Sequence, residues 1–164
     1  MMLRQTRRLQ LNQIWVGDIT YFSLEGGVFS YLAILMDLFS RRIVGWHLAD
    51  NMTESLVLRT LRSAVKTRQP LPGLIHHTDR GGQYAGNEYC LVLRRDEALQ
   101  SMSREGDCYG NAFMESCFGT IKIELEMTDF ESSRQARKEI AQYILYYDFD
   151  RRHSGIEYCL SVRA

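Results

Sequence analysis

The sequence has no long apolar run and only three lysines among its 20 basic residues. No stretch reaches the roughly eighteen uninterrupted apolar residues that a membrane-spanning helix needs. The N-terminal arginines are not followed by the apolar block of a secretory signal. We therefore expect a soluble, cytoplasmic protein without a membrane partner. The 164 residues, 45% of them hydrophobic, suffice for one ordinary core, so we also expect a single domain.

The cysteines lack the spacing of a metal or redox motif. No two are separated by two residues, which excludes a zinc ribbon and a redox pair, and we expect reduced thiols at Cys90, Cys108, Cys117 and Cys159. The formal net charge is zero, which neither indicates nor excludes a nucleic-acid partner. Arginine dominates the basic residues and its planar guanidinium suits phosphate, although genomic base composition produces the same bias as readily.

Three apolar segments near the start of the chain have the composition of strands. The first two, Ile14 to Phe22 and Val28 to Leu38, flank a turn at Glu25-Gly26-Gly27, which is a hairpin signal. A third segment, Arg42 to Ala49, follows closely. The pattern predicts a three-stranded antiparallel meander.

The middle of the chain then alternates helix and strand. Thr53 is expected to cap a helix that ends before Pro70, and a fourth strand is expected over Leu74 to His77. A helix over Asn87 to Glu97 and a brief strand over Leu99 to Met102 follow.

Two further helices are expected toward the C-terminus. Asn111 is a good N-cap for a helix that runs to about Met127, and a capping box made by Ser132 and Gln135 begins the last helix. Their buried positions are predicted to be Met114, Phe118, Ile121 and Leu125, then Ala136, Ile140, Ile144 and Tyr147. The elements together predict an α/β fold: a mixed five-stranded sheet, three antiparallel strands then two parallel, with helices on both faces. This layout suits a ribonuclease H-like fold.

Three carboxylates stand at notable places in this layout. Asp18 lies inside the first strand, where aspartate is disfavoured, and Asp79 ends the fourth strand, where open sheets tend to bind ligands. Glu115 lies one turn into a helix, and Lys122 returns to nearly the same helical angle seven residues later. Taken singly, each acid also fits an ordinary role as a solvent-facing strand residue, a turn opener or a solvated helix flank.

Acids on one strand, at the end of another strand and on a following helix can converge although they are distant in sequence. Magnesium prefers hard oxygen ligands and leaves coordination positions for phosphate and water. Two such ions about 4 Å apart would activate the attacking oxygen and stabilise the leaving oxygen of a phosphodiester. The three acids are therefore a candidate two-metal site for phosphoryl transfer.

The segments around these acids carry recognisable motifs, which are Trp15 to Thr20, Ile34 to Arg41, His77 to Tyr84, Ser101 to Arg104, Asn111-Ala112 and Glu115-Ser116. Sixty residues lie between Asp18 and Asp79, and thirty-five lie between Asp79 and Glu115. This combination closely resembles the second-reading-frame DDE transposases of bacterial insertion sequences, which have a retroviral-integrase-type catalytic core. The resemblance extends over roughly Asn12 to Val162. It implies a catalytic core over residues 12–164, preceded by a basic N-terminal arm over residues 1–11.

The resemblance implies catalytic and metal-binding roles for Asp18, Asp79 and Glu115, with Mg²⁺ or Mn²⁺ as the cofactor and two ions per active site when substrate is bound. The implied activity is that of a polynucleotidyl transferase. It hydrolyses a phosphodiester at a transposon end and then uses the freed 3′-hydroxyl to attack target DNA. No covalent protein intermediate is expected.

The resemblance also implies partners. Lys122 is implied to contact DNA near the cut end, and a loop from about Ser103 to Gly110 is implied to move over the substrate. Further DNA contacts are expected from Arg80, Arg104 and Asn111, and from a basic end of the last helix made by Arg151, Arg152 and His153. Related enzymes work as multimers on paired DNA ends, so a homo-oligomer is implied, and a separate helix-turn-helix polypeptide is a further partner to consider.

Other polar residues favour structural roles. Adjacent residues on a strand point to opposite faces, so His76 and His77 cannot chelate one ion together, and His77 shares a face with Asp79. Asp37 is the rival carboxylate, but its position beside Ser40 and Arg41 favours a strand-end cap or an ion pair.

The chain departs from the family pattern at Gly110, Asp148 and Val162, where aspartate, asparagine and proline are usual, and the helix-turn-helix segment that normally precedes the core is absent. These departures leave open an alternative function, that of a catalytically inactive or domesticated transposase remnant that binds DNA or a partner. A nuclease that hydrolyses DNA without joining it is a second alternative.

Overall fold

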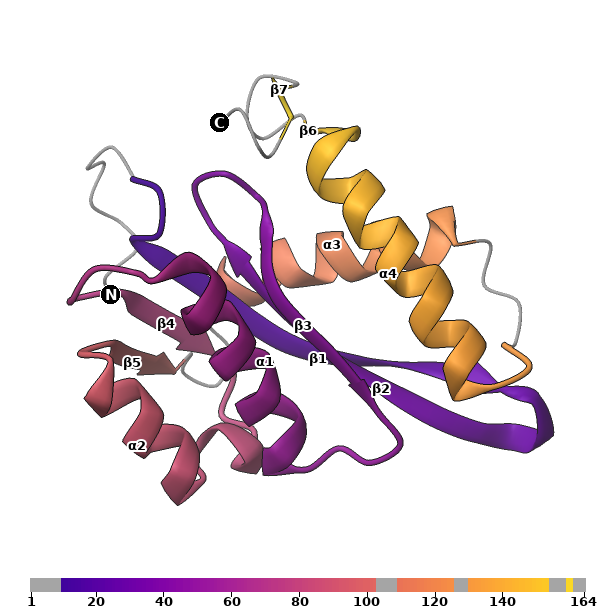
Figure 1. The fold of residues 1–164 in the computed structure, drawn as a ribbon, viewed down its shortest axis with the longest axis horizontal. Helices are drawn as coiled ribbons and strands as arrows, with labels where there is room; N and C mark the ends of the chain where they lie inside the picture. The colour runs from indigo at the N-terminus through magenta and orange to yellow at the C-terminus, as the bar shows by residue number, and fades with distance from the viewer. Residues whose placement is uncertain (1–9, 103–108, 126–129, 154–158, 161–164) are drawn as a thin grey trace.

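A five-stranded sheet forms the centre of the computed structural model, which describes residues 10–102, 109–125, 130–153 and 159–160. The strands lie in the order β3-β2-β1-β4-β5 (Figure 1). Their bounds are β1 (Ile14–Leu24), β2 (Val28–Asp37), β3 (Ile43–Ala49), β4 (Ile75–Thr78) and β5 (Leu99–Met102). The helices are α1 (Glu54–Arg68), α2 (Asn87–Arg95), α3 (Tyr109–Glu124) and α4 (Ser133–Phe149). Short elements are η1 (Glu25–Gly27), η2 (Gly82–Tyr84), β6 (Arg152–His153) and β7 (Cys159–Leu160).

The pairing of the strands agrees with the predicted mixed sheet. β1 and β3 each pair antiparallel with β2, whereas β4 runs parallel to β1 and β5 runs parallel to β4. The β1–β2 hairpin turns at Gly26 and Gly27, whose φ angles of 81° and 75° lie in the left-handed region that favours glycine. The predicted ribonuclease H-like layout of three antiparallel and two parallel strands is confirmed.

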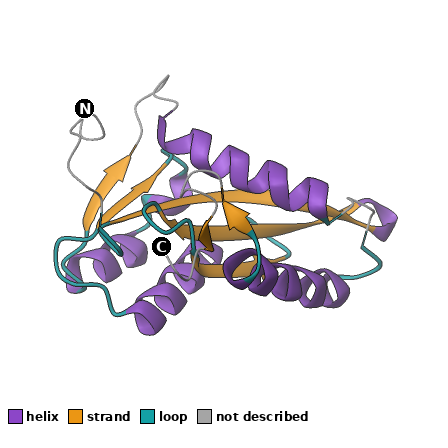
Figure 2. Cartoon of the chain, turned by 90° about the horizontal axis from the view of Figure 1, so that it is seen from above, coloured by secondary structure: helices purple, strands orange, loops and turns teal. Residues whose placement is uncertain are grey.

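Helices lie on both sides of the strands (Figure 2). One hydrophobic cluster joins the sheet to α3 and α4, and a second joins it to α1 and α2. The predicted buried positions of α3 and α4 belong to the first cluster, with Leu125 packed at its margin. Trp15 is fully buried in the second cluster, and Trp46 is half-buried against the first. Within the described residues, no helix is long and apolar enough to cross a membrane.

The ends of the last two helices differ in part from the prediction. α3 begins at Tyr109, so Asn111 lies inside its first turn and is not its N-cap. α4 begins as predicted, because Ser132 Oγ accepts a hydrogen bond from the Gln135 backbone N–H at 3.2 Å. It ends earlier than predicted, at Phe149, where the Tyr146 carbonyl accepts from the N–H groups of both Asp150 and Arg151.

That early end changes the setting of the basic residues that follow α4. Arg152 and His153 form β6, which pairs with β7, so the prediction that they close the last helix was wrong. A continuing α-helix would direct the Arg151 N–H to the Tyr147 carbonyl, four residues back, so its bond to the Tyr146 carbonyl, five residues back, departs from the helical pattern.

Asp148 ties α4 to the start of β3. Its Oδ1 accepts a hydrogen bond from the Ile43 backbone N–H at 2.9 Å, and its Oδ2 lies 3.5 Å from Arg42 Nε. The side chain is buried, and burial raises the pKa of its carboxyl from 3.8 to about 6, against the opposing effects of Ile43 and Arg42. A neutral asparagine is usual at this position in the family that the chain resembles. It would keep the hydrogen bond to Ile43 without the free-energy cost of burying a negative charge.

Asp148→Asn is therefore expected to stabilise the protein in a pH-dependent way. Because the carboxyl has a higher pKa when folded, the wild-type free energy of unfolding falls as pH rises from about 4 to about 6 and stays lower above that. The variant should gain about 1 to 2 kcal/mol at pH 8 and nothing at pH 4, measured by urea unfolding. An equal gain at both pH values would contradict this explanation.

Candidate active site

Asp18 lies near the middle of β1, on the sheet face that packs against α3. By strand alternation it shares this face with Val16 and Thr20, which are both buried. β4 pairs with β1 only along Ile14, Trp15 and Val16, so Asp18 stands just beyond the paired segment and is half-buried. The Ile19 backbone N–H donates to Asp18 Oδ1 at 2.7 Å and orients the carboxylate.

The register between β1 and β4 places Asp79 beside Asp18. The two strands run parallel, with Val16 opposite His77. Two residues further along, the same register brings Asp18 next to Asp79, and neighbouring strands are about 4.8 Å apart. Asp79 Oδ1 accepts from the Gly81 backbone N–H at 2.9 Å. A Cβ on Gly81 would lie 3.0 Å from that same oxygen, so glycine allows this close turn.

Glu115 reaches the same region from α3, the helix that packs along β1 and β4. Its side chain is exposed. The pKa of the Asp18 carboxyl is raised from 3.8 to about 6, first by burial and then by the negative charges of Asp79 and Glu115, against the opposing hydrogen bond from Ile19. The structure thus brings all three predicted carboxylates into one electrostatic environment, although they come from three different elements.

The chemistry of these donors fits a hard divalent cation. All three are carboxylates, and their mutual repulsion, visible in the raised pKa of Asp18, is what a bound cation would relieve. Within residues 10–102, 109–125, 130–153 and 159–160, no three His, Cys, Asp or Glu side chains lie close enough to hold one ion as they stand. If these three carboxylates were to bind one shared ion, their side chains would have to move toward it.

Three buried side chains, Tyr84, Tyr89 and His76, form a cluster beside the loop that follows Asp79, which we call the Tyr84 wall. Tyr84 is 2% exposed and packs edge-on against Tyr89, with ring centroids 5.6 Å apart. The Tyr89 hydroxyl hydrogen-bonds His76 Nε2, and Gln100 Nε2 donates to the Tyr84 carbonyl at 2.7 Å. Burial raises the pKa of Tyr84 well above 10, and Tyr89, Asp18 and Asp79 add to the effect.

Tyr84 therefore lies near the carboxylates, a placement that the sequence did not predict. The available signal was its place at the end of the His77 to Tyr84 motif. The same wall accounts for His76, whose pKa is lowered to about 4 by burial, so the side chain is neutral. His77 points to the other face of β4, and its Nδ1 lies 3.0 Å from Ser101 Oγ. The predicted separation of the two histidines is confirmed.

The residues predicted to bind DNA have different surroundings. Lys122, on α3, is half-buried, and its Nζ lies 5.0 Å from the centroid of the Tyr21 ring. Arg80 is exposed immediately after Asp79. Arg151 Nε donates to both carboxylate oxygens of Glu124, at 3.0 and 3.2 Å. Arg80 therefore adjoins Asp79 in the chain, whereas Lys122 lies about two helical turns along α3 from Glu115.

Four other predicted contacts have only a backbone position or none. Asn111 lies in α3, and Arg152 and His153 lie in β6. Arg104 and most of the predicted loop from Ser103 to Gly110 lie outside the described residues, as does Val162.

Asp37, the rival carboxylate, has a structural role. It is fully buried at the end of β2, and its Oδ1 accepts from the Asn12 backbone N–H at 2.8 Å. Its Oδ2 accepts from both the backbone N–H and the hydroxyl of Ser40, at 2.9 and 2.7 Å. The prediction of a strand-end cap is confirmed, and Asp37 is excluded from the carboxylate cluster.

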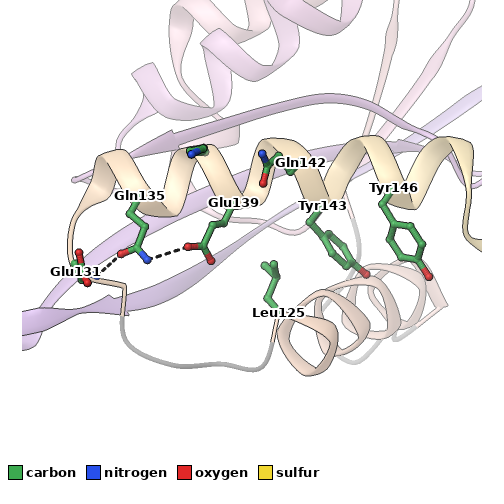
Figure 3. A pocket seen from close by; sticks show the side chains of 8 residues that line it. Leu125, Glu131, Gln135, Glu139, Gln142, Tyr143 and Tyr146 are labelled. Atoms are coloured by element: carbon green, nitrogen blue, oxygen red, sulfur yellow. Dashed lines mark hydrogen bonds between the residues drawn. The ribbon is translucent and has the colours of Figure 1, made fainter.

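A separate pocket lies between α4 and the end of α3, and its lining includes Leu125, Glu131, Glu139 and Tyr143 (Figure 3). Gln135 bridges the two glutamates of this pocket. It accepts from the Glu131 backbone N–H at 2.7 Å and donates to Glu139 at 2.8 Å. None of the three clustered carboxylates lines it, so the pocket is distinct from the candidate active site.

Comparison with known proteins places the fold and the family. The profile of the family described as Integrase core domain matches residues 8–108, and a second profile of the same description matches residues 97–160. The HTLV-2 integrase catalytic core domain, solved in complex with magnesium in a dimeric form, aligns with a TM-score of 0.67 at 16% identity. This alignment covers 91% of this chain and 94% of that one, and it shows a shared fold.

Two relatives in sequence are transposases. The transposase for insertion sequence element IS904 of Lactococcus lactis subsp. lactis (strain IL1403) is 44% identical over 149 residues, which cover 90% of this chain and 58% of that protein. The transposase InsF for insertion sequence IS3A of Escherichia coli (strain K12) is 41% identical over 145 residues, covering 87% and 50%. The chain thus spans about half the length of these curated relatives. Because the first profile covers more than half of the sequence, the chain belongs to the integrase core domain family, within which its close sequence relatives are transposases of bacterial insertion sequences.

Proposed function

We propose that this chain is the catalytic core of a DNA transposase, which hydrolyses a phosphodiester at an element end and joins the freed 3′-hydroxyl to target DNA. The observation that carries the proposal is the arrangement of Asp18, Asp79 and Glu115 on β1, the end of β4 and α3, where burial and then the charges of Asp79 and Glu115 raise the pKa of Asp18. A buried acid that is further destabilised by two like charges is costly, and perturbed carboxylates of this kind cluster at functional sites.

In the proposed mechanism the three carboxylates would hold Mg²⁺ or Mn²⁺. Two bound ions would supply activation of the attacking oxygen and stabilisation of the leaving oxygen. The chain orients the ligands, because Ile19 N–H holds the Asp18 carboxylate and Gly81 N–H holds that of Asp79. A water or a DNA 3′-hydroxyl attacks the phosphorus and the 3′-oxygen of the broken bond leaves in line, so the protein forms no covalent bond.

The proposed partners are element-end DNA, target DNA and further copies of the chain. Arg80 follows Asp79 directly and Lys122 lies about two turns along α3 from Glu115, and both would neutralise DNA phosphates. The relatives named as transposases and the magnesium-bound integrase core support this assignment. A helix-turn-helix polypeptide that reads the element ends is a further proposed partner. The inactive-remnant alternative is not favoured, because the chain resembles transposases and keeps all three acids, with Asp79 and Glu115 acting electrostatically on Asp18.

Joining separates a transposase from a nuclease. A duplex that already carries a free 3′-hydroxyl end should be joined to a labelled target duplex in the presence of Mn²⁺, giving a longer labelled strand on a denaturing gel. Hydrolysis of the target without any joined strand would instead identify a nuclease, and the proposal would be wrong.

Metal binding is a second prediction. Manganese at one hundred times its dissociation constant stabilises a protein by about 2.7 kcal/mol, which corresponds to a rise in Tm of roughly 5 to 10 °C for a chain of this size. Asp18→Asn should lose most of this shift, whereas Asp150→Asn, at an exposed position after α4, should keep it. Unchanged melting of the wild-type protein in Mn²⁺ and Mg²⁺ would remove the support for a metal site.

A further inference from the structure

Two large aromatic side chains are exposed at the far end of the β1–β2 hairpin. The exposed fractions of Tyr21 and Phe29 are 55% and 43%. Their ring centroids lie 5.3 Å apart, and the rings are nearly perpendicular at 85°. This hairpin extends beyond α1 and α2 (Figure 1), so neither helix covers its end. An aromatic pair that is ordered by its own contact and left open to solvent is well suited to receive a planar partner.

The aromatic pair lies further along β1 than Asp18 and, by strand alternation, Tyr21 points to the opposite face, but Lys122 of α3 reaches its ring across the edge of the strand. From Asp18 to Tyr21 the strand rises about 10 Å, at roughly 3.4 Å per residue. From Glu115 to Lys122 the helix also rises about 10 Å, at roughly 1.5 Å per residue. Asp18 and Glu115 interact at one end of this interval. At the other end, Lys122 Nζ stands 5.0 Å from the Tyr21 ring centroid.

The pairing of β1 leaves this side open to a ligand. β4 pairs with β1 only as far as Val16, so within the described residues no strand pairs with the edge of β1 between Asp18 and Tyr21. An acidic cluster, an ammonium and an exposed aromatic pair therefore follow one another along this open edge, and a ligand that joins them would pass from one face of β1 to the other. A single nucleic-acid strand carries the groups that match them: one phosphate for the carboxylates, a further phosphate for Lys122 and a planar base for the aromatic rings. Successive bases on one strand are about 3.4 Å apart.

We propose that Tyr21 and Phe29 form a stacking platform for an unpaired DNA base within about three nucleotides of the phosphate held at the carboxylates, with Lys122 facing the intervening phosphate. This inference rests on the proposed function and names which DNA the site prefers: an end whose strands are separated. Aromatic faces stack on any base and cannot reach one inside an intact duplex, so the platform favours single-stranded ends without reading sequence. The positive charge of Lys122 complements the strand that lies across it.

The test is a comparison of two DNA probes that need no cleavage. Fluorescence anisotropy would measure binding of a blunt duplex and of the same duplex with a three-nucleotide single-stranded overhang. The wild-type protein should prefer the overhang, and Tyr21→Ala should lose roughly tenfold in affinity for it with little change for the blunt duplex. Tyr21→Phe retains the ring and should retain the preference. Tyr146→Ala is the matched control, since Tyr146 is 46% exposed on α4 in the separate pocket (Figure 3).

The outcomes separate this inference from the proposed function. Equal losses on both probes, or no loss, would overturn the platform while leaving strand transfer to be judged by joined products. A lower molecular mass of Tyr21→Ala in light scattering, with the overhang preference unchanged, would identify the aromatic pair as an interface between copies and would also overturn it. Overhang preference that depends on Tyr21 in a protein unable to join DNA would support the platform and contradict the proposed function alone.

Discussion

Asp18→Asn is expected to abolish DNA strand transfer and, at the same time, to stabilise the metal-free protein. The loss of activity should be on the order of a thousandfold or more, because the substitution removes a carboxylate ligand at the centre of the proposed site. The side chain keeps its size, and its amide oxygen can still accept the hydrogen bond from Ile19 N–H. Joined products quantified over time would measure the effect.

The gain in stability follows from the sign of the pKa shift. The Asp18 carboxyl has a pKa of about 6 in the folded protein against 3.8 as its ordinary value, owing to burial and to the charges of Asp79 and Glu115. The free energy of unfolding therefore falls as pH rises between about 4 and 6, and the full cost remains at pH 8. Removing the charge should return about 1 to 2 kcal/mol at pH 8, measured by urea unfolding without metal.

Asp150→Asn provides the matched control, since Asp150 is exposed and lies outside the cluster. It should change neither joining nor stability by a measurable amount. Lost activity together with gained stability distinguishes a metal ligand from a structural residue, because substituting a merely structural aspartate would lower both the activity and the stability of the protein. Strand transfer at the wild-type rate by Asp18→Asn would exclude Asp18 as a ligand.

The sheet was predictable because its signals are local. The Glu25-Gly26-Gly27 turn fixes a hairpin between two apolar segments, and the change from alternating to helical periodicity after Thr53 marks where the crossover begins. The capping box at Ser132 likewise fixes the start of α4 within the chain itself. Each of these predictions depended on residues that are close in sequence.

The arrangement of the site depended on contacts that are distant in sequence. Asp18 and Asp79 adjoin because of the parallel register of β1 and β4, which local composition does not encode. Tyr21 and Lys122 meet because a strand and a helix rise by equal distances beside each other. The aromatic pair and the Tyr84 wall were therefore missed, whereas Asp18 and Asp79 were noticed because a charged residue inside a strand or at its end is unusual, and Glu115 was proposed through the motif around it.

Asp37→Asn, the same chemical change on the neighbouring strand, is expected to have the opposite effect on stability. Asp37 is fully buried and accepts three hydrogen bonds, from Asn12 N–H and from the N–H and hydroxyl of Ser40. An amide group would turn an NH₂ toward at least one of these buried donors. Leaving a buried donor unsatisfied costs about 1 to 3 kcal/mol, and the loss of a charged acceptor adds to it.

We therefore expect Asp37→Asn to lower the free energy of unfolding by about 2 to 4 kcal/mol while leaving strand transfer per folded molecule unchanged at a temperature below its Tm. Urea unfolding and joining assays should therefore give opposite results for the two variants. Asp37→Asn should be active and less stable than wild type, and Asp18→Asn should be inactive and more stable. The two acids lie on adjacent antiparallel strands, so a shared effect of misfolding cannot produce opposite signs. If Asp37→Asn lost joining activity without losing stability, Asp37 would belong to the catalytic set and the assignment of the acids would have to be revised.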